Sequence, residues 1–177
     1  MHKPIRLNSG FTLVELLIVV IILALLSAIV VPQFSASTDD AKSSAADTSL
    51  ANIRAAIDLY YQQHGEYPGA IASTATGCSG STTGGGAINT AQAVLEQLSL
   101  YTDGDGAACS LADATFKYGP YIKKPTLENE PFGETNVLEV VSAGDLDMGA
   151  TTGDPGGFKY DVKTGKIIIN IAAHESR

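Results

Sequence analysis

The sequence predicts an α+β protein in which one long N-terminal helix packs on a small antiparallel β-sheet. Helical signals extend from residue 12 to residue 64 with no loop between them. Short β-branched and aromatic runs separated by turn residues occur only after residue 136. A length of 177 residues leaves room for one ordinary domain beside the apolar part of the helix. The formal charge of −8 argues against nucleic acid as a partner, because phosphate binding needs a basic surface.

The helix begins with an apolar run that continues to Val31 and follows a short segment holding Lys3 and Arg6. Its length of about 20 residues is what a helix needs to cross the hydrocarbon core of a bilayer. Glu15 is the one charged residue inside it, and a charge at such a place is costly unless it has a function. A cleaved secretory signal peptide is one alternative, although the run is long for its apolar region. A plain signal anchor with a cytoplasmic N-terminus is another, and it leaves Glu15 unexplained.

The stretch Gly10-Phe11-Thr12-Leu13-Val14-Glu15-Leu16 resembles the class III signal sequence of type IV pilins and type II secretion pseudopilins. The resemblance implies a pilin-like fold and a leader peptide over residues 1–10. A prepilin peptidase would cut between Gly10 and Phe11, and Phe11 would be N-methylated. Residues 11–31 would form the transmembrane segment and later the filament core. Glu15 would pair with the N-terminal amine of a neighbouring subunit, which would fix the register between apolar helices.

The second half of the predicted helix, residues 32–65, is amphipathic. Pro32 is expected to kink the helix where the apolar run ends, because proline removes a backbone donor and clashes with the preceding turn. An apolar stripe at helical spacing follows and is expected to pack on the sheet: Ala46, Leu50, Ile53, Ile57, Tyr60 and His64. His64 is interpreted as a residue of the helix end and not as a ligand. Gly65 is the expected C-cap.

Residues 66–177 form the expected exported globular domain, which begins with a variable Gly/Ser/Thr-rich loop at residues 70–89. A short amphipathic helix is predicted over residues 90–101, with Thr90 as its N-cap. Cys78 and Cys109 enclose this helix and are expected to form a disulfide in an oxidising compartment; two free thiols are the alternative. Neither cysteine has the spacing of a structural zinc site.

Three strands are expected after this region, as a C-terminal β-meander. They are Asn136–Val141, Phe158–Val162 and Lys166–Ile171, with a hairpin turn at residues 163–165 between the last two. The alternation of residues 167–171 predicts a last strand that is covered on both faces. The segments at residues 118–125 and 156–166 are similar to the corresponding segments of major type II secretion pseudopilins, and they favour that subclass.

No catalytic motif is present, and the sequence predicts no enzyme. No cofactor is expected. Three loop aspartates, Asp145, Asp147 and Asp154, are weak candidates for calcium ligands, because they match no defined ligand spacing. Solvated loop carboxylates are the preferred interpretation.

The resemblance implies a structural subunit of a helical filament that is assembled from the inner membrane. A type II secretion pseudopilin is the first expectation and a type IV pilin of a surface pilus is the alternative. An alternative of another class is a signal-anchored periplasmic binding or enzymatic domain that never polymerises. The implied partners are further copies of the chain, minor pilin-like subunits, prepilin peptidase and an inner-membrane assembly platform. The N-terminus would be cytoplasmic and the globular domain periplasmic, before release into a periplasmic or cell-surface filament.

Overall fold

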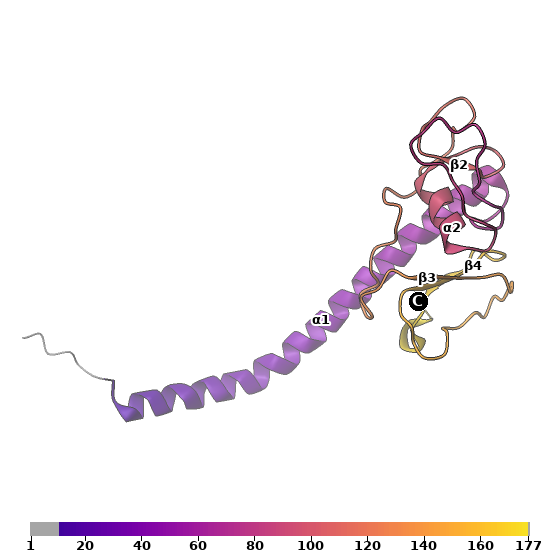
Figure 1. The fold of residues 1–177 in the computed structure, drawn as a ribbon. Coiled ribbons are helices and arrows are strands. Elements are labelled where there is room, and N and C mark those ends of the chain that lie inside the picture. Colours follow the sequence, from indigo (N-terminus) through magenta and orange to yellow (C-terminus); the bar gives the residue numbers. More distant parts are fainter. Residues whose placement is uncertain (1–10, 177) are drawn as a thin grey trace, which may run out of the picture. The chain divides into compact units, whose positions relative to one another are not determined.

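The computed structural model describes residues 11–176, and at residues 29–36 it describes the backbone alone. The elements in chain order are α1 (Leu13–His64), α2 (Ala91–Ser99), β1 (Tyr101–Thr102), β2 (Ala108–Cys109), β3 (Leu138–Val141), β4 (Phe158–Asp161), β5 (Ile167–Ile169) and the 3-10 helix η1 (Ala172–His174). The chain divides into two compact units, Met1–Ala41 and Lys42–Arg177. We call the second unit the head. The predicted α+β class, with a long N-terminal helix, is confirmed (Figure 1).

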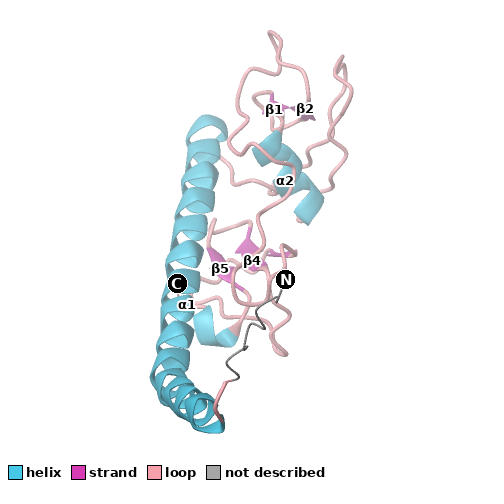
Figure 2. Cartoon of the chain, turned by 90° about the vertical axis from the view of Figure 1, so that its left-hand side faces the viewer, coloured by secondary structure: helices cyan, strands magenta, loops and turns pink. Residues whose placement is uncertain are grey.

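The head is built on the last part of α1. The predicted apolar stripe is buried from Ala46 to Tyr60, and none of its five side chains there is more than 8% exposed. α2 and the C-terminal strands lie along the same side of this part of α1 (Figure 2). Side chains from these elements and from the loop before β3 complete the core: Val94, Leu98, Leu127, Leu138, Phe158, Tyr160, Val162, Ile167 and Ile169. The helix therefore forms one wall of the core of the head.

α1 ends where the sequence predicts. Gly65 has a φ of +73° and its amide donates to the carbonyl of Tyr61 at 2.8 Å. This left-handed conformation is the usual end of a helix, and glycine adopts it without the steric cost of a Cβ.

The larger sheet has the order β3-β4-β5. β4 and β5 form the predicted antiparallel hairpin, and all three residues of β5 are buried, as the pattern of isoleucines indicated. β3 runs parallel to β4, however, and the expected antiparallel meander is wrong for this strand. The reason is the connection at residues 142–157, which returns the chain to the start of the neighbouring strand; a parallel pair needs a long crossover of this kind.

A second, two-stranded sheet was not predicted. α2 ends at Ser99, two residues before the expected end, and Tyr101 enters β1 instead. β1 pairs antiparallel with β2, which contains Cys109. The predicted N-cap of α2 is confirmed, because the Thr90 hydroxyl accepts a hydrogen bond from the Ala93 amide at 3.2 Å.

Three buried polar side chains hold the loops of the head to its core. Gln97 donates to the carbonyls of Ile71 and Gly106 and accepts from the Gly69 amide at 2.6 Å. Asp161 accepts from three backbone amides, and Glu130 accepts from two. All three are fully buried. Since a buried polar group without a partner is costly, these contacts fix the loop paths.

The Tyr160 hydroxyl is buried and has no hydrogen-bond partner among the described residues. Burial raises the pKa of this phenol far above its ordinary value. We expect the Tyr160→Phe variant to have a free energy of unfolding equal to or above that of the wild type, because the substitution removes a polar atom that gains nothing in the folded state. Tyr121→Phe is the matched control. Its hydroxyl donates to Gln63 at 2.6 Å, and its loss should cost about 0.5–1.5 kcal/mol. Urea denaturation of the two variants measures the difference.

His64 is half-buried at the end of α1, between the ring of Tyr60 at 4.1 Å and that of Tyr118 at 5.1 Å. Its Nε2 lies 3.0 Å from the Thr102 hydroxyl and 3.1 Å from the Tyr121 hydroxyl. Burial lowers the pKa of the imidazole below its ordinary value of 6.5. As the pH falls, His64 of the unfolded chain is therefore protonated at a higher pH than His64 of the folded chain.

The pH dependence of stability follows from this difference. The contribution of neutral His64 is present above pH 6.5 and is lost as the pH falls from that value toward the lower folded-state pKa. We expect the free energy of unfolding to decrease between about pH 7.5 and pH 5.5, and the decrease to be smaller in the His64→Gln variant. Urea melts at several pH values measure both slopes. Equal slopes in the two proteins would contradict the assignment.

Candidate functional site

The N-terminus of α1 is organised by Thr12 and Glu15. The Thr12 amide and hydroxyl both donate to Oε2 of Glu15, at 2.9 and 2.7 Å, and the Glu15 amide donates back to the Thr12 hydroxyl at 3.2 Å. This reciprocal pair is a capping box, which satisfies backbone amides that have no partner inside the helix. The sequence analysis missed the role of Thr12, although the T-x-x-E spacing of residues 12–15 is the signal for it.

The capping box also places the carboxylate. Glu15 lies in the first turn of α1, one turn from Phe11, which is 79% exposed. No other charged residue occurs between Phe11 and Thr38. A single anionic group therefore lies at the end of a long uncharged segment, close to the residue that was predicted to carry a new N-terminal amine.

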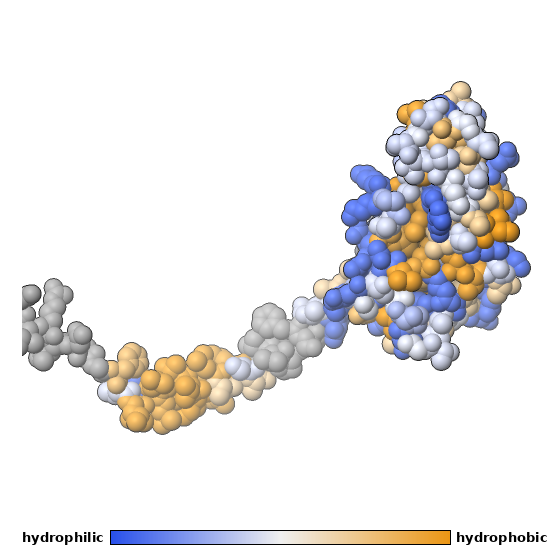
Figure 3. Space-filling model, in the orientation of Figure 1, coloured by the Kyte–Doolittle hydropathy of each residue, from blue (hydrophilic) through white to orange (hydrophobic). Residues whose placement is uncertain are grey.

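The helix that follows is apolar around its whole circumference and is exposed. Its large apolar side chains are between 47% and 82% exposed, and they are Leu13, Val14, Leu16, Leu17, Ile18, Val19, Val20, Ile21, Ile22, Leu23, Leu25 and Leu26. Figure 3 shows this segment as an almost uninterrupted hydrophobic surface. Soluble monomers rarely expose apolar patches of this extent, and such a surface marks a site of interaction.

No helix within the described part of the chain is long and apolar enough to cross a membrane. The predicted membrane segment, residues 11–31, extends past residue 28 into positions whose side chains lie outside the described residues. The leader at residues 1–10, and with it Gly10, also lies outside them. The side chain of Pro32 lies outside them too. The backbone at this position belongs to α1, which is continuous there. The cleavage position and the kink stay predictions.

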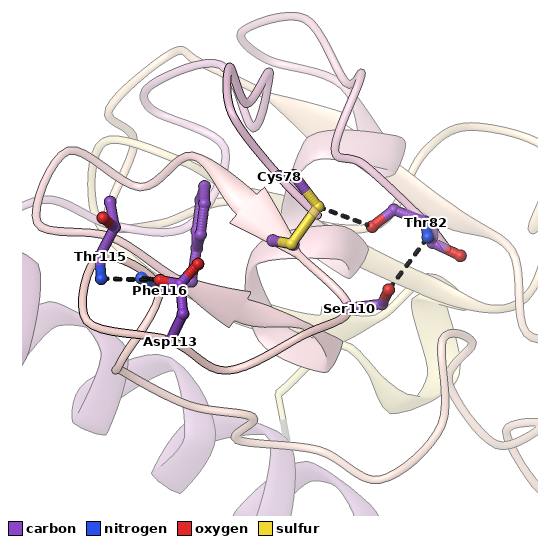
Figure 4. The surroundings of a disulfide bond; sticks show 7 residues. Cys78, Thr82, Ser110, Asp113, Thr115 and Phe116 are labelled. Carbon is purple, nitrogen blue, oxygen red and sulfur yellow. Dashed lines mark hydrogen bonds between the residues drawn. A yellow bond between two sulfur atoms is a disulfide. The ribbon is translucent and has the colours of Figure 1, made fainter. Parts of the chain in front are cut away.

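The structure joins Cys78 and Cys109 in the expected disulfide, with the two Cα atoms 5.6 Å apart (Figure 4). Cys109 is fully buried in a small cluster with Ala75 and Phe116. The bond connects the loop at residues 70–89 to β2. The Ser110 hydroxyl accepts from the Thr82 amide at 3.0 Å and holds the same two segments together.

Two of the three candidate calcium ligands accept hydrogen bonds from backbone amides. Asp145 accepts from the Asp147 amide at 2.9 Å, and Asp154 accepts from the Ala172 amide at 2.7 Å. Across the described residues, no three acidic, histidine or cysteine side chains are close enough together to hold a metal ion.

The N-terminal segment of the chain is similar in sequence to known proteins. Residues 5–31 match the family model of the prokaryotic N-terminal methylation motif. The chain is 44% identical over 63 residues to the type II secretion system core protein G of Pseudomonas aeruginosa, an alignment that covers 36% of this chain and 44% of that protein. It is 40% identical over 63 residues to a fimbrial protein of Neisseria meningitidis, covering 36% and 37% of the two chains. The core protein G of Vibrio cholerae is 35% identical over 66 residues, covering 37% of this chain and 45% of that protein.

These matches confirm the resemblance to type IV pilins and type II secretion pseudopilins. The chain spans less than half the length of these curated relatives, so the likeness concerns about a third of the sequence. No solved structure matches the chain.

Proposed function

We propose that the chain is a structural subunit of a pilin-like helical filament. The observation that carries the proposal is the exposed apolar helix of residues 13–26. Its first turn holds Glu15, whose carboxylate takes part in the N-terminal cap. Burial of apolar surface is favourable by about 25 cal/mol per Å², and a surface of this length needs a cover of similar length. Lipid provides it in a membrane, and identical helices provide it in a filament.

The processing step follows from the methylation motif. Prepilin peptidase cuts between Gly10 and Phe11, and Phe11 is N-methylated. The new amine and the Glu15 carboxylate of a neighbouring copy then attract each other in surroundings of low dielectric constant. Such contacts between different surfaces of identical chains generate an open helix when the rotation between neighbours does not close a ring.

The subunit enters the filament from the inner membrane. Lys3 and Arg6 stay on the cytoplasmic side and the head lies in the periplasm. Prepilin peptidase, the inner-membrane assembly platform and minor pilin-like subunits are the other partners. The relatives named above are secretion and fimbrial proteins by name, and not enzymes, which supports a structural role for this chain.

Within this proposal, a type II secretion pseudopilin is the first candidate. The similarity to core protein G in two organisms supports it, as do the segments at residues 118–125 and 156–166. A type IV pilin is the second candidate, supported by the similarity to the fimbrial protein. Deletion of the gene separates them. Loss of protein secretion indicates the first, and loss of surface fibres with secretion intact indicates the second.

The proposal is tested by producing the full chain together with a prepilin peptidase and an assembly platform. Electron microscopy of sheared cell fractions should reveal fibres that contain the chain. A chain that stays dispersed in the membrane fraction, while the same platform assembles an established pilin, would favour a signal-anchored domain that does not polymerise.

A further inference from the structure

The head has a groove between α1 and the segment at residues 121–128, which follows β2 in the sequence. Its volume is about 540 Å³, and its apolar lining includes Ile53, Leu127 and Phe158. Asn52 lines one side, where α1 is exposed to solvent. Lys123 and Lys124 lie on the opposite side. The groove is therefore an apolar trough with cations along one edge.

The two lysines differ in what surrounds them. Lys124 forms an ion pair with Glu128, which also lines the groove. Lys123 is exposed and forms no ion pair within the described part of the chain. An occupant of the groove would thus meet one uncompensated positive charge beside an apolar floor.

A complementary feature lies on the loop that follows β3. Leu146 is 75% exposed, more than any other large apolar side chain of the head. It stands between Asp145 and Asp147, which are exposed as well. The sequence therefore presents one apolar side chain flanked by two carboxylates.

This loop is held in a defined conformation. The buried carboxylate of Asp161 accepts from the amides of Gly144 and Asp145 at 2.7 and 3.1 Å. The Lys166 ammonium donates to the carbonyl of Leu146 at 2.7 Å. Because these bonds already fix the backbone, the loop loses little further conformational entropy when Leu146 contacts a partner.

The groove and the loop lie at opposite ends of β4. Phe158, the first residue of β4, lines the groove, and Asp161, the last residue, holds the loop. One chain therefore cannot easily fill its own groove with its own loop.

We propose that Leu146 of one copy inserts into the groove of the next copy, with its flanking aspartates facing Lys123. The proposal rests on the filament function above and names a contact between heads. The contact joins two different surfaces of identical chains, so it repeats from copy to copy and is compatible with a filament when the rotation between neighbours does not close a ring. Charge complementarity selects this occupant, since an acidic loop with an apolar tip matches an apolar groove with a basic edge.

Cysteine cross-linking of assembled full-length chains tests the contact. The Asn52→Cys, Leu146→Cys double variant carries one cysteine in the groove and one at the loop tip, while both native cysteines are held in a disulfide. Mild oxidation of filaments should give a ladder of dimers, trimers and longer species on a non-reducing gel. The matched control is the Asn52→Cys, Leu111→Cys pair, in which the second cysteine replaces a side chain that is 49% exposed on another loop. It should give no ladder.

Two further variants test the chemistry of the contact. Leu146→Ser should lower filament yield roughly tenfold, because it removes the apolar anchor. Lys123→Glu should lower the yield by a smaller factor, and adding Asp147→Lys should restore it. Lys117→Glu, at an exposed lysine away from the groove, is the control.

The outcomes separate this proposal from the filament function. Normal filaments with no ladder, and normal yield from Leu146→Ser, would overturn the head contact and leave the filament function in place. Absence of fibres from the wild-type chain would overturn both. A ladder that stops at dimers would mean a closed contact and would also contradict the proposal.

Discussion

A Glu15→Gln chain is expected to be cut after Gly10 at the wild-type rate but to form few or no filaments. Glutamine keeps the size of the side chain and can still accept hydrogen bonds from Thr12, so the capping box and the start of α1 are preserved. Only the charge is lost. The amine of Phe11 on the neighbouring copy then has no counter-ion, and removal of one partner of a buried ion pair costs about 3–5 kcal/mol.

Filament yield by electron microscopy and the N-terminal mass of the processed chain measure the two effects separately. Ser27→Ala is a suitable control, because the hydroxyl donates to the carbonyl of Leu23 in its own helix at 2.7 Å and has no predicted role between copies. Its filaments should be normal. Normal filaments from Glu15→Gln would refute the pairing role of the carboxylate.

Removal of the disulfide is expected to have the largest effect on the stability of the head. Cys78 and Cys109 are 31 residues apart, and the loop that they close contains α2 and β1. In the chain-entropy description, such a bond stabilises the folded state by about 3–4 kcal/mol. The Cys78→Ser, Cys109→Ser double variant should lose about that much, and it also places a hydroxyl in the apolar cluster around Phe116.

Urea denaturation of the full chain, with and without reductant, measures this loss. The Ser110→Ala variant is a matched control because it removes one hydrogen bond between the same segments and should cost only about 1 kcal/mol. An unfolding midpoint that is unchanged by reduction of the wild type would contradict the stabilising role of the bond.

The N-terminal third was predictable because its signals are local. The helix of residues 13–64, its end at Gly65 and the buried stripe from Ala46 to Tyr60 follow from helical periodicity and capping chemistry. The motif formed by Gly10, Phe11 and Glu15, which resembles the prepilin signal, is local as well because it lies within a few residues. The role of Thr12 was not predicted, although its spacing from Glu15 is equally local, because Glu15 was interpreted as a partner for a neighbouring subunit and not for its own helix.

The sheet was predictable only in part, because strand pairing depends on residues far apart in the sequence. The β4–β5 hairpin has a short turn that limits the pairing to one possibility. The 142–157 connection allows either direction for β3, and nothing in the alternation of Val137, Glu139 and Val141 distinguishes a parallel from an antiparallel neighbour. The two-residue strands β1 and β2 are shorter than any periodic signal.

The groove and the loop at Leu146 could not be predicted from the sequence. The lining of the groove comes from three separate parts of the chain: α1, the segment at residues 121–128 and the start of β4. The three loop aspartates were predicted as possible metal ligands, whereas no role was predicted for the exposed leucine between two of them. Its exposure is a tertiary property, since leucine is among the residue types that are most often fully buried.

The mass of the mature N-terminal peptide tests the account most directly. Peptide mapping of the chain from cells that contain a prepilin peptidase should give a mature protein that begins with N-methylated Phe11. An intact Met1, or a cut near Ala36 as for a secretory signal peptide, would contradict the processing step and with it the filament subunit.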